Sequence, residues 1–132
     1  MGGSTPSLKP MFFTYPGHGE ILSKEFHYSQ AVRIGNRIEI SGEGGWNPTT
    51  GAISSSLAEE IEHAFSNVEL ALQAASPDPT TKVTWRQSVA ATLKRFCGPE
   101  HRPILTVVGV PQLALPGMNT EIEVVALVDL NN

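Results

Sequence analysis

The clearest pattern of hydrophobic and polar positions lies in the middle of the chain. Apolar residues recur there at helical spacing, at Leu57, Ile61, Ala64, Phe65, Val68 and Leu72. Ser56 precedes this stretch and Glu59 follows three residues later, which is typical of a capping box at a helix start. Pro77 and Pro79 cannot continue a helix. The pattern therefore predicts a helix over 57–75.

A β-hairpin is predicted before that helix. Two β-favouring runs, residues 27–34 and 37–46, flank Gly35-Asn36, and both turn residues tolerate positive φ. The resulting register pairs Arg33 with Ile38 and Ala31 with Ile40. Each face of the hairpin then mixes apolar and charged side chains. This mixture predicts a sheet that is covered by helices on one side and by something else on the other.

Shorter segments complete the expected organisation. We predict a loop over 41–51, strands over 81–85, 103–110 and 120–128, and a helix over 88–96. Residues 1–20 are rich in glycine and proline and are predicted to form a flexible N-terminal arm, with residues 11–13 docking on the body. Residues 21–132 should form one domain. The element order predicts an α+β fold with two helices on one face of a sheet.

The last predicted strand carries two acids at its start. Glu121 and Glu123 are two residues apart, a spacing that aims both side chains at the same face of a strand. The second half, Val124 to Val128, is wholly apolar and does not alternate with polar residues. A sheet with one solvated face would show such alternation. We therefore expect both faces of this strand to be covered, one by helices and one by another subunit.

Composition narrows the classes of function. The chain has 132 residues, enough for one domain. Its net charge of −4 makes nucleic acid an unlikely binding partner, because such proteins usually carry a concentration of positive charge. Its single cysteine, Cys97, excludes an internal disulfide and a cysteine zinc site. The histidines, His18, His27, His63 and His101, show no metal-ligand spacing, and we predict no metal. No apolar run is long enough to span a membrane, no secretory signal is visible, and the cytoplasm is the expected compartment, with the mitochondrion as the alternative.

Four motifs in sequence order resemble the Rid/YjgF family of reactive intermediate deaminases, also labelled endoribonuclease L-PSP. They are "YSQAV" leading to "SG", then "NPTTGAI", "NVELALQAA" and "LPG" before "EIEVVAL", within residues 26–128. The resemblance implies a chorismate-mutase-like fold with a mixed sheet, a homotrimer, and three clefts between neighbouring subunits. It also implies cofactor-free hydrolysis of enamines and imines made by pyridoxal-phosphate enzymes.

The resemblance also suggests residue roles. Glu121 matches the family carboxylate that helps hold the attacking water, and Tyr28 matches a family tyrosine that would orient substrate or water. The alternatives are an ion pair at the subunit seam for Glu121 and an aromatic that fills the interface for Tyr28. Glu123, His27 and His101 are secondary acid–base candidates, and Cys97 is interpreted as structural.

One position departs from the family pattern. Relatives that deaminate imino acids carry an arginine two residues after the proline of the penultimate strand, where it binds the substrate carboxylate. Here that proline is Pro103 and the matching residue is Leu105, or Val107 in a shifted alignment. Arg102 precedes the proline, so it is not equivalent. We therefore expect a less charged, more apolar substrate and weak or no turnover of 2-iminobutanoate.

Two further residues are candidates for the cleft. Trp46 is expected to supply an aromatic wall, with packing on its own loop as the alternative, and Gly44 belongs to a glycine run whose backbone N–H groups would face a ligand. Relatives also have more residues between the two helices than 76–87 supply, so 81–85 is either a compressed strand or the remainder of a longer segment.

The leading expectation is therefore a cofactor-free enzyme, deaminase- or hydrolase-like, acting on a small reactive imine, enamine or related intermediate. The alternatives are a non-catalytic trimer that binds small molecules or acts as a chaperone and, third, an endoribonuclease.

Overall fold

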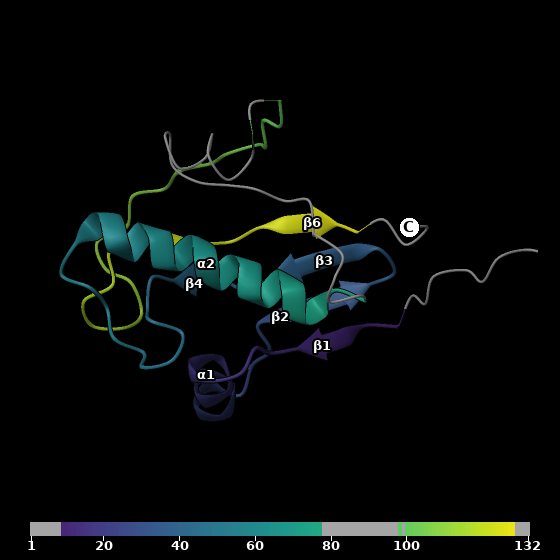
Figure 1. The fold of residues 1–132 in the computed structure, drawn as a ribbon, viewed down its shortest axis with the longest axis horizontal. Coiled ribbons are helices and arrows are strands. Elements are labelled where there is room, and N and C mark those ends of the chain that lie inside the picture. The colour runs from purple at the N-terminus through teal and green to yellow at the C-terminus, as the bar shows by residue number, and fades with distance from the viewer. Residues whose placement is uncertain (1–8, 78–97, 99, 129–132) are drawn as a thin grey trace, which may run out of the picture.

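The computed structural model describes residues 9–77, 98 and 100–128. Its elements are β1 (Met11–Phe13), α1 (His18–Phe26), β2 (Ala31–Ile34), β3 (Arg37–Ile40), β4 (Glu43–Gly44), α2 (Leu57–Ala75), β5 (Glu121–Ile122) and β6 (Val125–Leu127). Figure 1 shows α2 lying across a layer of strands, and the predicted α+β class is confirmed. The strand predicted over 81–85 and the helix predicted over 88–96 lie outside the described residues.

The helix predicted over 57–75 is confirmed with the same bounds as α2. The Ser56 side chain accepts a hydrogen bond from the Glu59 backbone N–H at 3.3 Å, as an N-cap should. The Glu59 carboxylate does not complete the capping box, because it accepts instead from the Ser54 hydroxyl at 3.0 Å. Most of the apolar stripe of α2 is buried, with Ala64, Phe65, Val68, Ala71, Leu72 and Ala75 in the main core.

The hairpin register is also confirmed: Ala31 pairs with Ile40 and Arg33 with Ile38. The strands form a four-stranded sheet in the order β1-β2-β3-β6 and a two-stranded sheet of β4 and β5, and every pairing between them is antiparallel. Ala31, Ile38, Ile40 and Ala126 belong to the core cluster that includes α2. The Arg33 guanidinium donates to the Ala75 carbonyl at the end of α2, which ties β2 to the helix. One face of the sheet is therefore packed against α2.

The opposite face of this sheet is uncovered in the single chain, and we call it the open face. Cross-strand pairing aligns Phe12, Val32, Glu39 and Val125 in one row across the four strands, and Ile34, Arg37 and Leu127 in a second row. Phe12 is 66% exposed, Leu127 63% and Val125 48%. Val124, Ala126 and Val128 are buried, as expected for their side of the strand. Cover of the other side by a second subunit remains a prediction.

The predicted N-terminal arm is corrected from residue 11 onward. Met11–Phe13 form β1, which pairs with β2, so the expected docking of these residues takes the form of an edge strand. His18–Phe26 form α1, whose first N–H donates to the Pro48 carbonyl at 2.8 Å. Gly19 in this helix packs against Tyr15 and Gln30, where a Cβ would lie within 2.7 Å of both side chains. The glycine that suggested a loop serves close packing instead.

Two strand predictions near the C-terminus need correction. Residues 101–110 have no regular secondary structure, so the strand predicted over 103–110 was wrong. Neither of the two sheets supplies a hydrogen-bonding neighbour for this segment, and β-propensity alone does not make a strand. The strand predicted over 120–128 is divided in two: β5 pairs with β4 in one sheet and β6 with β3 in the other.

Candidate functional site

A cavity of about 490 Å³ opens on the open face beside α1. It is lined by Phe12, His27, Tyr28, Ser29, Ala31, Val32, Glu39, Ile40 and Ser41. Phe12, Val32 and Glu39 belong to a single cross-strand row, so their side chains share the face turned away from α2. The cavity combines an apolar floor with hydroxyl, imidazole and carboxylate groups. No lysine or arginine is among these lining residues.

Tyr28 enters the cavity from the segment between α1 and β2. Its carbonyl accepts a hydrogen bond from the Ser23 hydroxyl of α1 at 2.7 Å, which fixes the backbone at this position. Burial raises the pKa of the Tyr28 phenol above its usual 10, and the nearby Glu43 and Glu121 carboxylates raise it further. The phenol therefore keeps its proton at neutral pH and can donate a hydrogen bond in the cavity.

Glu121 begins β5, where it pairs with Gly44, and its side chain is exposed. The carboxylate lies over Gly42: a Cβ added to that glycine would lie 2.7 Å from the Glu121 Cδ atom. Gly42 follows Ser41, which lines the cavity. Glu121 and Tyr28 also lie within electrostatic reach of one another. The structure thus brings the two residues suggested by the family resemblance to one region of the molecule.

Other candidates lie elsewhere. Trp46 is buried, and its indole N–H donates to the Tyr15 hydroxyl at 3.0 Å, so it packs in the interior and does not wall this cavity. Gly44 is buried in β4, with Trp46 and Met118 where a side chain would otherwise lie. Arg102, Leu105 and Val107 are exposed on the segment without secondary structure and do not line the cavity.

The secondary acid–base candidates are separated in the same way. His27 lines the cavity and has left-handed backbone geometry at the end of α1, with φ 53°. Glu123 follows β5 in the chain and is exposed. His101 is exposed on the segment 101–110, which has no regular secondary structure. Cys97 lies outside the described residues. His27 is therefore the only one of these that the cavity includes.

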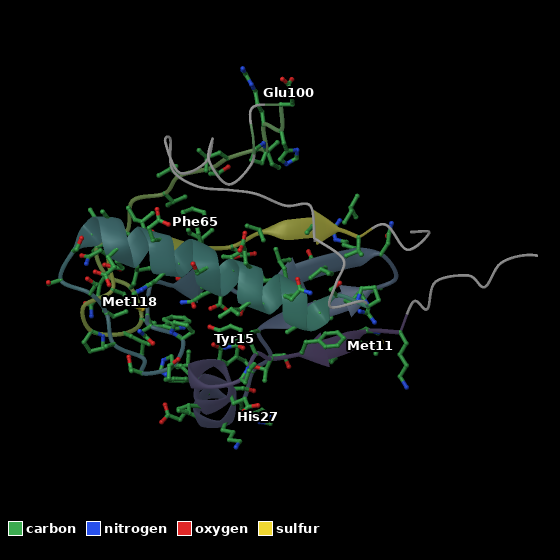
Figure 2. The ribbon with its side chains drawn as sticks, in the orientation of Figure 1. Met11, Tyr15, His27, Phe65, Glu100 and Met118 are labelled. Carbon is green, nitrogen blue, oxygen red and sulfur yellow. The ribbon has the colours of Figure 1, made fainter. Side chains whose placement is uncertain are left out.

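Sequence reasoning missed a buried polar network behind the site. The Tyr15 hydroxyl donates to the Glu43 carboxylate at 2.8 Å and accepts from the Trp46 indole N–H. Glu43 has no exposed surface, and burial raises the pKa of its carboxyl to about 8. In the view of Figure 2, Tyr15 lies in the interior between α1 and α2. Nothing in the glycine-rich stretch around Glu43 indicated that its side chain would be buried.

A second missed residue, Glu60, is on α2 and is also fully buried. Its carboxylate accepts hydrogen bonds from Asn119 and Thr120, the two residues before Glu121. The sequence did contain a signal for it, because Glu60 and Asn67 are polar residues on the apolar stripe of α2. A polar residue at such a position needs a hydrogen-bonding partner in the core.

Two general searches of the described residues gave negative results. No group of three or more histidine, cysteine, aspartate or glutamate side chains within residues 9–77 and 98–128, Pro99 excepted, is arranged to hold a metal ion. Over the same part of the chain, no helix has the length and apolar character needed to cross a membrane.

Comparison with known proteins gives consistent matches. The family model described as endoribonuclease L-PSP matches residues 20–128. A RutC family protein from Aquifex aeolicus is 32% identical over 110 residues, covering 76% of this chain and 87% of that protein. Protein MMF1, mitochondrial, from Saccharomyces cerevisiae is 31% identical over 111 residues, covering 76% and 74%.

Solved structures agree with this assignment of the fold. A Thermotoga maritima protein named as a candidate endoribonuclease superposes with a TM-score of 0.60 at 33% identity, covering 77% of this chain and 87% of that one. A protein named YJGH superposes with a TM-score of 0.68 over 95% of this chain and 98% of its own, and at 24% identity it supports the fold alone.

Proposed function

Because the chain belongs to the endoribonuclease L-PSP family, also called Rid/YjgF, we propose that it is a cofactor-free hydrolase of small imines or enamines. The reaction would take place in a cleft that includes the cavity on the open face. The observation that carries the proposal is that Tyr28 lines this cavity and that Glu121 lies over Gly42, the residue after the cavity residue Ser41. This is the pair of groups that imine hydrolysis needs.

In the proposed reaction, water adds to the carbon of a C=N bond. The Glu121 carboxylate accepts a proton from water as the new C–O bond forms, while the imine nitrogen takes a proton from solvent to give a carbinolamine. Glu121 then returns its proton to this nitrogen, the C–N bond breaks with loss of ammonia, and the hydroxyl group releases its proton to solvent to leave a carbonyl. Tyr28, kept protonated by the raised pKa of its phenol, donates a hydrogen bond that orients the water or the substrate.

Assembly as a homotrimer is part of the proposal. The open face carries the exposed apolar side chains Phe12, Ile34, Val125 and Leu127, and contiguous apolar surface of this kind marks interaction sites. A cyclic arrangement of three copies would cover the open face of each chain and turn the cavity into a cleft between subunits.

The substrate proposed for this cleft lacks a carboxylate. The Glu39 carboxylate at the cavity is paired with Arg37 at 3.1 Å. The described lining residues include no lysine or arginine that could bind a substrate carboxylate. Leu105, at the position of the family arginine, supplies no cation either. We expect propan-1-imine, generated in situ by oxidation of propylamine with O₂ and an added amine oxidase, to be hydrolysed at least about tenfold faster than 2-iminobutanoate, a loss typical of an unpaired charge in a binding site.

The decisive test compares two exposed glutamates that are two residues apart, Glu121 in β5 and Glu123 just after it. Glu121→Gln should lower kcat for propan-1-imine at least about 100-fold, the usual contribution of a general base. Glu123→Gln, which makes the same chemical change two residues away, should leave kcat within about twofold. Turnover is followed as the initial rate of ammonia release above the rate measured without the protein. Equal rates for Glu121→Gln and the unchanged protein would contradict the proposed role.

Endoribonuclease activity is the second candidate, because the family description and the Thermotoga maritima protein carry that name. The net charge of −4 disfavours it, since binding of RNA depends on neutralising phosphates with lysine and arginine. Cleavage of single-stranded RNA that is lost in Glu121→Gln, together with no turnover of any imine, would favour this candidate. Absence of both activities would favour a non-catalytic binding protein.

A further inference from the structure

The carboxylate of Glu60 accepts three hydrogen bonds from two adjacent residues, two from backbone N–H groups and one from a side-chain amide. The Asn119 N–H donates to Glu60 Oε2 at 2.6 Å, the Asn119 side-chain amide donates to Oε1 at 2.9 Å, and the Thr120 N–H donates to Oε2 at 3.1 Å. Asn119 and Thr120 are the two residues directly before Glu121. The interaction therefore joins the first turns of α2 to the start of β5, across about sixty residues of sequence.

Burial makes these hydrogen bonds important. Glu60 has no exposed surface, so its carboxyl oxygens depend on hydrogen-bond donors within the protein to replace water. Asn119 and Thr120 supply those donors. The position of residues 119–120 is thus tied to a buried side chain of α2.

The same part of α2 also holds the partner strand of β5. Gly45, next to β4, packs so closely on Glu60 that an added Cβ would overlap the Glu60 carbonyl oxygen and Cγ. About two helical turns further along α2, the Asn67 side-chain amide donates to the Gly44 carbonyl at 2.9 Å and to the Trp46 carbonyl at 2.8 Å. Helix α2 therefore anchors both strands of the two-stranded sheet on which Glu121 stands.

We infer that Glu60 is a positioning residue for Glu121, holding the start of β5 through Asn119 and Thr120 so that the Glu121 carboxylate stays over Gly42, next to the cavity residue Ser41. This inference rests on the proposed function. Glu60 does not line the cavity, so it acts only through the backbone that it holds. β5 is only two residues long and pairs with two residues of β4, so the ladder alone gives little restraint on where Glu121 lies.

Glu60→Gln tests the inference, because glutamine keeps the size of the side chain but replaces one accepting oxygen with an NH₂ donor. We expect kcat for propan-1-imine to fall about tenfold or more with KM within about twofold, since a displacement near 1 Å of a reacting group costs up to about 100-fold in rate. Glu69→Gln, on the exposed side of the same helix, is the matched control and should change neither constant. An unchanged kcat in Glu60→Gln would overturn the inference.

A double variant separates positioning from general stability. In the Glu121→Gln background, Glu60→Gln should produce no further loss of kcat, because the group that it positions is already absent. Independent losses that multiply would show that Glu60 does not act through Glu121, and they would overturn the inference.

Amide hydrogen exchange distinguishes failure of this inference from failure of the proposed function. Glu60→Gln should accelerate exchange at the Asn119 and Thr120 amides at least about tenfold, with no such change in Glu69→Gln. If Glu121→Gln retains full turnover, the proposed function fails, and accelerated exchange still supports the restraint of β5 by Glu60. Unchanged exchange at both amides overturns the inference whatever the turnover results.

Discussion

Replacing Glu43 with glutamine should change how the stability of this protein depends on pH. Glu43 is fully buried, and burial raises the pKa of its carboxyl from 4.5 to about 8. The hydrogen bond from the Tyr15 hydroxyl lowers this pKa, and the nearby Glu121 charge raises it again. At neutral pH the folded protein therefore keeps a proton on Glu43, whereas the unfolded chain releases it.

The sign and size of the effect follow from this difference. Between pH 4.5 and about 8 the folded state holds one proton more than the unfolded state, so the free energy of unfolding decreases as pH rises. The favourable contribution is fully present below pH 4.5 and is lost as pH rises through about 8. At about 1.4 kcal/mol per pH unit, the total loss is about 5 kcal/mol.

Chemical denaturation at pH 5, 6, 7, 8 and 9 measures this effect. The difference in unfolding free energy between Glu43→Gln and the unchanged protein should move by about 1.4 kcal/mol per pH unit up to about pH 8 in favour of the variant, and then level off. Histidines titrate equally in both proteins and cancel in the difference. Protein concentration must be held constant, because subunit association would add to the measured stability.

Glu25→Gln, an exposed residue of α1, is the control for the loss of one carboxylate. Its stability curve should run parallel to that of the unchanged protein. If the curves of Glu43→Gln and the unchanged protein also run parallel from pH 5 to pH 9, Glu43 is ionised in the folded state and the reasoning is refuted.

The remaining predictions concern assembly and the core. The chain should have a mass near three times 14.2 kDa in light scattering. Val125→Asp should abolish the trimer, because it places a charge on the open face, which the other subunits would cover. Ile21→Asp changes a similarly exposed apolar residue of α1 and should leave the trimer intact. If the unchanged protein is a monomer, the proposed trimer is wrong. Phe65→Ala should cost about 3–5 kcal/mol in urea unfolding, because Phe65 projects from α2 into the buried core. Phe26→Ala, at an exposed position, should cost less than about 1 kcal/mol, and equal costs would contradict the described core.

The elements that could be predicted from sequence are those that depend on local interactions. α2 has the predicted bounds because its N-cap, its apolar spacing and the prolines beyond it all act within a few residues. The hairpin has the predicted register because the conformation of Gly35-Asn36 sets which residues face each other.

The errors arose where a distant contact decides the local structure. α1 contains a glycine and follows Pro16-Gly17, both signs of a loop, yet Gly19 is required for packing against Tyr15 and Gln30. Residues 103–110 have strong β-propensity but make no ladder with any strand in the part of the chain that the structure describes. The stretch 120–128 changes its partner from β4 to β3, which no property of that stretch alone specifies.

The candidate site divides in the same way. Motifs in the sequence were enough to suggest Tyr28 and Glu121, because residue type and order along the chain carry a family resemblance. The roles of Glu43 and Glu60 depend on partners 28 and about 60 residues away. Burial and hydrogen bonding of a carboxylate are set by the groups that folding brings around it. Only the tertiary structure therefore decided that Glu43 keeps its proton at neutral pH and that Glu60 binds the start of β5.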